Sequence, residues 1–116
     1  MLIDTRAMDF RLTDAILRHV EYRVETALGP LARHVLKVTA RLEDLNAGRG
    51  GIDKRCRLAV ALRRGGLVVA QALDVDLYAA IDVAARRARR SVLRTLKQHV
   101  GRERSDRRRP AALVPA

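Results

Sequence analysis

Two successive segments of the chain alternate apolar and polar residues with a period of two, and this pattern constrains the fold most. In residues 34–44 the apolar positions are Leu36, Val38, Ala40 and Leu42, and the polar positions are Lys37, Thr39, Arg41 and Glu43. In the next segment Cys56, Leu58, Val60 and Leu62 alternate with Arg55, Arg57 and Arg63. Successive side chains of a strand point to opposite faces of a sheet. We therefore expect two half-buried antiparallel strands, followed by a third over residues 67–73.

The turn at Gly65-Gly66 sets the register of that third strand. A two-residue loop would place the Gln71 amide on the buried face, and burying an unpaired amide costs roughly 1–3 kcal/mol. A three-residue loop instead turns Val68, Ala70 and Ala72 inward, so we favour it. The other face then presents an apolar patch of Val35, Ala59, Ala61 and Val69, which is typical of a contact surface. Residues 46–51, rich in glycine, predict a flexible connection.

A further strand and two helices are predicted on either side of these three strands. Residues 1–8 read as a further strand, and residues 14–28 as a helix that Thr13 caps and that Gly29-Pro30 ends, with the glycine in a left-handed cap. Asp74 or Asp76 can cap a last helix. Its apolar stripe consists of Leu77, Ile81, Ala84, Ala85, Ala88, Val92 and Leu96.

The opposite arc of that last helix is basic. At 100° per residue, its basic residues lie within roughly 100° of one another. They are Arg86, Arg87, Arg90, Arg94 and Lys97. Solvated helices usually interleave acids at i,i+4, but no acid occurs from Val83 to Gly101. The chain carries a net charge of +11 at pH 7, so the arc predicts an anion-binding face for a polyanion such as RNA.

Composition narrows the remaining possibilities. Aromatic residues make up 3% of the chain, which disfavours a binder that stacks bases on aromatic side chains. Residues 102–116 are basic without apolar periodicity, so we expect a folded domain over residues 1–100 and a disordered tail over 101–116. The chain lacks a signal-peptide pattern and a long apolar run, which predicts a cytoplasmic protein without a membrane partner.

Several other chemistries are disfavoured by the sequence. His19, His34 and His99 fall on different predicted elements, so we expect no metal site. Cys56 alternates with core residues and is expected to be a buried hydrophobe rather than a nucleophile. The three aspartates near the start of the last helix have structural roles that make a catalytic role unnecessary. Asp74 and Asp76 can cap the helix, and Asp82 can pair with Arg86 at i,i+4. We therefore expect no catalytic residues, no cofactor and no small-molecule substrate, and hence no enzyme.

Three sequence motifs resemble those of the ribosome hibernation promoting factor family, also called ribosome-associated translation inhibitors. They are Phe10-Arg-Leu-Thr-Asp-Ala-Ile, Val38-Thr-Ala-Arg-Leu-Glu and Asp76-Leu-Tyr-Ala-Ala-Ile-Asp82, and the resemblance covers about residues 2–98. It implies an α+β fold of β-α-β-β-β-α order, with a four-stranded mixed sheet and two helices packed on one face. The chain ends without a second domain, so it resembles the short type of the family.

The resemblance also implies a function. Such a protein binds the small ribosomal subunit and its rRNA in the channel that messenger and transfer RNA would occupy, and thereby inhibits translation. Family positions that face ribosomal RNA correspond to Arg87, Arg90 and Arg94, and the helical arc adds Arg86 and Lys97. Two alternatives stay open: a general binder of double-stranded RNA, and an interaction module that self-associates through the exposed sheet face.

Overall fold

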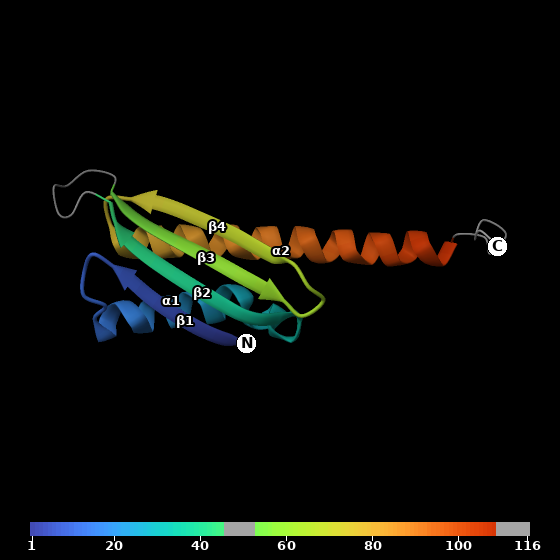
Figure 1. Ribbon diagram of the computed structural model, residues 1–116, viewed down its shortest axis with the longest axis horizontal. Coiled ribbons are helices and arrows are strands. Elements are labelled where there is room, and N and C mark those ends of the chain that lie inside the picture. The colour runs from blue at the N-terminus through green and yellow to red at the C-terminus, as the bar shows by residue number, and fades with distance from the viewer. Residues whose placement is uncertain (46–52, 109–116) are drawn as a thin grey trace.

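The computed structural model describes residues 1–45 and 53–108, with side chains described as far as residue 101. Figure 1 shows its elements in chain order. They are β1 (Leu2–Met8), α1 (Asp14–Leu28), the 3-10 helix η1 (Gly29–His34), β2 (Val35–Asp44), β3 (Lys54–Leu62), β4 (Leu67–Asp74) and α2 (Leu77–Arg108). The predicted loop over residues 46–51 lies outside the described residues.

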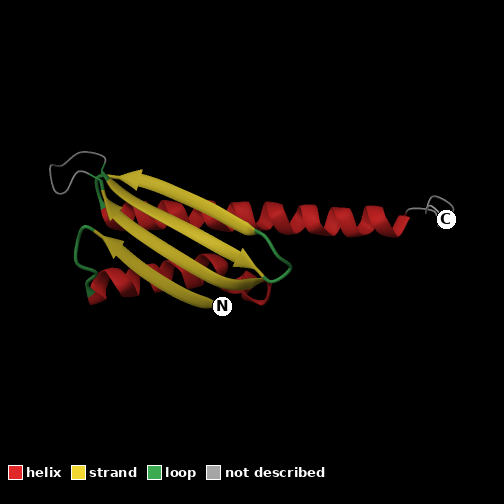
Figure 2. Cartoon of the chain, in the orientation of Figure 1, coloured by secondary structure: helices red, strands yellow, loops and turns green. Residues whose placement is uncertain are grey.

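The four strands form one sheet in the order β1-β2-β3-β4. β1 pairs with β2 in parallel, whereas the β2–β3 and β3–β4 pairs are antiparallel. Figure 2 shows both helices on the same side of this sheet. The expected α+β fold, with its mixed sheet and its two helices on one face, is confirmed.

The core lies between the sheet and the two helices. Its α2 side is lined largely by small residues, Ala80, Ala84 and Ala88, each fully buried. Val20, Val24 and Leu28 contribute the α1 side, and Cys56, Leu58 and Val60 the middle of the sheet. Because alanine side chains are small, α2 can pack closely against the strands. The side of α2 opposite these alanines faces solvent.

The β3–β4 turn has the predicted three-residue length. The Leu62 amide donates to the Gly66 carbonyl at 3.1 Å, and Val60 lies opposite Val68. Gly65 and Gly66 have φ angles of 93° and 98°, a region that glycine enters without the strain of a Cβ. Gln71 is exposed, as the cost of burying its amide predicted.

The start of β2 corrects the predicted face assignment. A register shift between Val35 and Lys37 inserts one residue into the strand, so that Val35 is fully buried and Leu36 is 51% exposed. Such a bulge reverses the faces of the residues before it. Leu36 is therefore not a core residue, and Val35 does not belong to the apolar patch on the outer face.

The end of α1 also differs from the prediction. Gly29 has φ −52° and ψ −46°, so it is right-handed and does not form a left-handed cap. The chain continues directly into η1, with Pro30 in its first turn. Proline suits this position because its fixed φ is helical and its missing N–H would have no partner there.

Helix α2 continues to Arg108, past the domain end expected at residue 100. Figure 1 shows its C-terminal part projecting beyond the sheet. Residues 109–116 lie outside the described residues, and the disordered tail remains a prediction.

Candidate nucleic-acid interface

Two aspartates fix where α2 begins. The Asp76 carboxylate accepts a hydrogen bond from the Tyr78 amide at 3.0 Å, and its backbone carbonyl accepts one from the Ala80 amide at 3.0 Å. The Asp74 carboxylate accepts from the Asp76 amide at 3.0 Å. Asp76 is thus the helix cap, which satisfies an otherwise unpaired amide of the first turn. This start determines which residues of α2 face the sheet.

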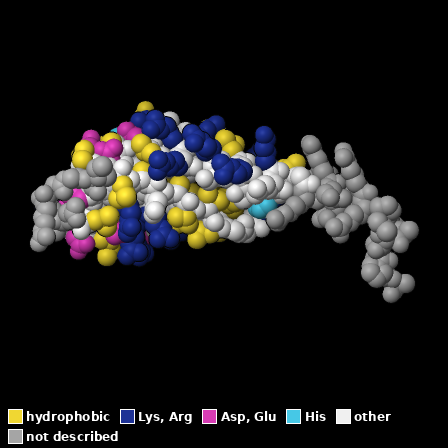
Figure 3. Space-filling model, turned by 90° about the horizontal axis from the view of Figure 1, so that it is seen from above, with side chains coloured by type: hydrophobic (Ala, Val, Ile, Leu, Met, Phe, Trp, Pro, Cys, Tyr) yellow, Lys and Arg dark blue, Asp and Glu magenta, His cyan; other side chains and the backbone are white. Residues whose placement is uncertain are grey.

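The five predicted residues lie together on the side of α2 that faces away from the core. Arg86, Arg87, Arg90, Arg94 and Lys97 are all exposed. At a rise of 1.5 Å per residue, the stretch from Arg86 to Lys97 covers about 16 Å of helix. Figure 3 shows a run of Lys and Arg side chains along one side of the molecule. The structure therefore assembles a basic surface, named here the α2 arc, from these five residues.

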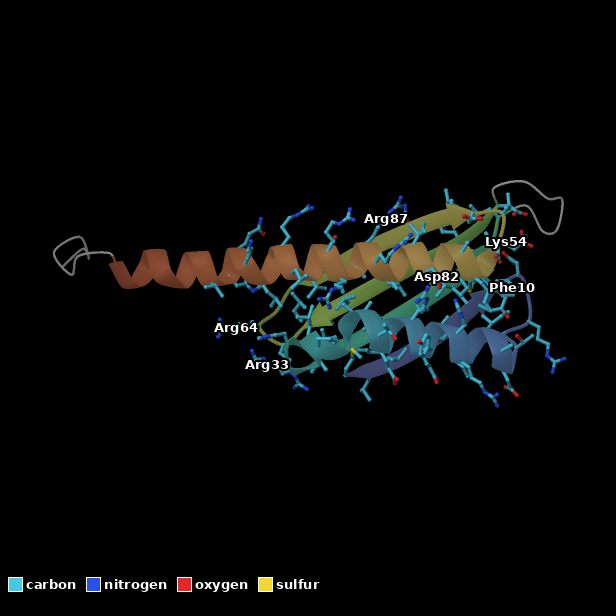
Figure 4. The ribbon with its side chains drawn as sticks, turned by 180° about the vertical axis from the view of Figure 1, so that it is seen from behind. Phe10, Arg33, Lys54, Arg64, Asp82 and Arg87 are labelled. Carbon is cyan, nitrogen blue, oxygen red and sulfur yellow. The ribbon has the colours of Figure 1, made fainter. Side chains whose placement is uncertain are left out.

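Arg87 also has a structural role. Its guanidinium donates a hydrogen bond to the Gln71 carbonyl of the edge strand β4 at 2.8 Å. Edge strands expose unpaired backbone groups, and this contact satisfies one of them. A guanidinium has five N–H donors, so Arg87 keeps donors for a further anion. Figure 4 shows Arg87 beside β4.

Asp82 pairs across the helices rather than along α2. Its carboxylate accepts from Arg23 Nε at 2.6 Å and lies 2.7 Å from His19 Nε2, both on α1. The predicted pairing of Asp82 with Arg86 is therefore wrong, because α1 packs beside this face of α2 and supplies the cation, Arg23. The Arg23 hydrogen bond, opposed by desolvation and aided by His19, lowers the pKa of Asp82 from its ordinary value.

A groove between α1 and α2 extends the α2 arc toward α1. It has a volume of about 220 Å³, and its lining includes Arg23, Asp82, Arg86 and Arg89. Arg89 donates to the Ala27 carbonyl at 2.9 Å. The sequence pattern did not identify Arg23 or Arg89 as site residues. Arg89 belongs to the same arginine run but lies outside the arc, and only the packing of α1 reveals Arg23.

A second opening, with a volume of about 230 Å³, lies beyond the C-terminal end of α1. Arg33 and His34 of η1, Arg64 of the β3–β4 turn and His99 of α2 line it. Figure 4 shows Arg33 and Arg64 close to this end of the sheet. Two histidines expected on separate elements thus share one opening. Within residues 1–45 and 53–108, no three His, Cys, Asp or Glu side chains are grouped as metal ligands would be.

Cys56 is fully buried, and burial raises the pKa of its thiol to about 12. A thiol that stays protonated and inaccessible is a poor nucleophile, in agreement with the predicted core role. No helix in the described part of the chain is both long and apolar enough to cross a membrane.

These features define a class: a small α+β domain with a four-stranded sheet, two helices on one face and an exposed basic arc on the second helix. Within that class, residues 3–99 match the family model described as "Sigma 54 modulation protein / S30EA ribosomal protein". The chain belongs to this family, which places it among ribosome-associated modulation proteins.

Solved structures agree with this assignment. The N-terminal domain of Protein Y from Thermus thermophilus is 31% identical, with 82% of this chain and 99% of that one covered and a TM-score of 0.65. A ribosomal subunit interface protein from Coxiella burnetii shares the fold, with a TM-score of 0.73, 15% identity and coverage of 84% of this chain and 99% of that one. No curated protein matches significantly.

Proposed function

We propose that this protein inhibits translation by occupying the channel of the small ribosomal subunit in which messenger and transfer RNA lie. The observation that carries the proposal is the α2 arc, five exposed cations on a helix whose opposite face is held in the core. Family membership supports the ribosome as partner, and so does the likeness in fold to a ribosomal subunit interface protein.

The proposed mechanism is occupancy rather than catalysis. The arginines of the α2 arc neutralise rRNA phosphates and release condensed counterions, which supplies affinity. The four-stranded sheet packs behind the helix, so the bound domain fills space that other RNA would need. The proposed place of action is the cytoplasm, where ribosomes work, and no cofactor is required.

The proposal is tested by neutralising the arc. Arg87→Gln, Arg90→Gln and Arg94→Gln together should weaken binding to purified small subunits by roughly 30-fold at moderate salt, because each lost phosphate contact removes counterion release. A matched control, Arg11→Gln with Arg18→Gln and Arg63→Gln, removes the same charge from exposed positions elsewhere. Equal binding by the two triple variants would contradict the proposal.

A general binder of double-stranded RNA remains the second candidate. The observation that favours it is geometric, because a basic helix on an α+β domain can contact A-form RNA by shape alone. Equal affinity for an unrelated RNA duplex and for intact small subunits would support that function instead.

A further inference from the structure

The outer face of the sheet, the side away from the helices, carries a line of arginines that the α2 arc does not explain. In the strand register Arg6 lies opposite Arg41, and Arg41 lies opposite Arg57. Alternation turns all three side chains away from the core, and all three are exposed. We name these three residues the arginine row. Adjacent strands are about 4.8 Å apart, so the row spans about 10 Å across β1, β2 and β3.

Folding alone does not favour such a row. Like charges directly opposite each other on neighbouring strands destabilise a sheet. Salt bridges within the face relieve this only in part: Arg6 Nε lies 3.1 Å from Asp4, and Arg41 Nε lies 3.5 Å from Glu43. Glu43 is shared, because Arg55 donates to it at 2.8 Å. The Arg57 side chain forms no hydrogen bond or close ion pair within the described part of the chain. The Arg55 hydrogen bond is the main cause that lowers the pKa of Glu43, and the charge of Arg57 adds to this effect from a longer distance.

The surface between these arginines is hollowed and can receive an anion. A depression of about 240 Å³ is lined by Arg41, Arg57, Thr39 and Ala59. The two guanidinium groups flank it, the threonine hydroxyl adds a donor, and the small Ala59 side chain leaves room for close approach. Over the whole face, cations outnumber acids: Arg6, Lys37, Arg41, Arg55 and Arg57 against Asp4 and Glu43. Figure 3 shows a second group of basic side chains on the side opposite the longer run.

We infer that the arginine row is a second binding site for the phosphate backbone of RNA, on the opposite side of the sheet from the helices. This inference rests on the proposed function and extends it, because a protein with basic surfaces on two sides can contact two RNA segments at once. The charge of the arginine row also disfavours binding of a second copy of the chain to this face, since pairing two arginine rows would bring like charges together.

The test uses a double variant, Arg41→Gln with Arg57→Gln, and a charge-matched control, Arg11→Gln with Arg18→Gln. We expect the row variant to bind purified small subunits roughly 10-fold more weakly at moderate salt. The slope of the logarithm of the binding constant against the logarithm of the salt concentration should also be smaller in magnitude by about 2. The control should change neither quantity comparably. The row variant should also unfold at the same or a higher urea concentration than the wild type, because cross-strand repulsion is relieved.

The outcomes separate this inference from the proposed function. If the row variant binds as the control does while the α2 triple variant is weakened, the inference is wrong and the proposed function stands. If the wild type does not bind subunits, the same variants are titrated with an RNA duplex of about 16 base pairs. If only the row variant then binds the duplex more weakly, the arginine row is an RNA-binding site, although channel occupancy is not supported. If the row variant binds the duplex as the wild type does, the arginine row is not an RNA-binding site.

Light scattering tests whether a second copy of the chain occupies this face instead of RNA. The wild type is expected to be monomeric over the concentrations used for binding. A concentration-dependent dimer that Arg57→Gln strengthens or abolishes would overturn the inference, because the face would then be an interface between two copies of the chain.

Discussion

At the scale of single residues, Asp82 links the two helices and its effect depends on pH. The Arg23 hydrogen bond lowers the pKa of Asp82 below its ordinary value of 3.8. The carboxylate therefore stabilises the fold above that pH, and this contribution is lost as the pH falls further and the group is protonated. Asp82→Asn should lower the free energy of unfolding by about 1 kcal/mol at pH 7, a modest value because the pair is partly solvated.

Urea unfolding at pH 7 and near pH 3 measures this effect. The difference between the wild type and Asp82→Asn should shrink at the lower pH. The control is Glu21→Gln on the exposed side of α1, which should leave stability within about 0.5 kcal/mol of the wild type. A difference of the same size at both pH values would contradict the role of the Asp82 charge.

The single thiol provides a second prediction at this scale. Because burial raises the pKa of Cys56 to about 12, the folded protein should react with a thiol reagent at pH 7.5 far more slowly than the protein in urea. Absorbance during reaction with a chromogenic disulfide reports both rates. Rapid labelling of the folded protein would place Cys56 near the surface.

Residue pairings were the least predictable part of the site. The i,i+4 spacing suggested Arg86 as the partner of Asp82, but Arg23 is 59 residues away in sequence and makes the contact. Local spacing describes neighbours on one helix only. How two helices pack depends on the whole core, so Arg23 and Arg89 could not be assigned to the groove from the sequence.

At the scale of elements, periodicity predicted most of the structure. The interior positions of β3 and β4 follow strict alternation, and the cost of burying Gln71 settled their register. The five cations of the α2 arc were found in the same way, because a helix repeats regularly over its length. The arginine row was not found, since it requires the parallel register of β1 on β2, which alternation within one strand leaves open.

The bulge at the start of β2 is testable at this scale. Val35→Ala should cost about 2 kcal/mol of unfolding free energy, because Val35 is fully buried. Leu36→Ala should cost less than about 0.5 kcal/mol, because Leu36 is half exposed. Denaturant unfolding compares the two variants. A larger loss for Leu36→Ala would indicate the unbroken alternation that the sequence pattern alone predicts.

At the scale of the whole molecule, charge governs the proposed activity. An interface built from phosphate contacts should lose affinity steeply with salt, roughly 3-fold per contact between about 50 and 200 mM monovalent salt. Titrating labelled protein with small subunits over this range gives the slope. The slope should fall in both the α2 triple variant and the row variant. Affinity that does not change with salt would show that phosphate contacts do not drive binding.

Occupancy of the channel for messenger and transfer RNA is tested most directly by competition. The measurement is co-sedimentation of the protein with purified small subunits at moderate salt, with messenger and transfer RNA added together as competitors. We expect saturable binding that these RNAs displace and that an equal mass of unrelated duplex RNA leaves largely intact. Binding that persists in the presence of messenger and transfer RNA, or that naked duplex RNA abolishes, would contradict channel occupancy.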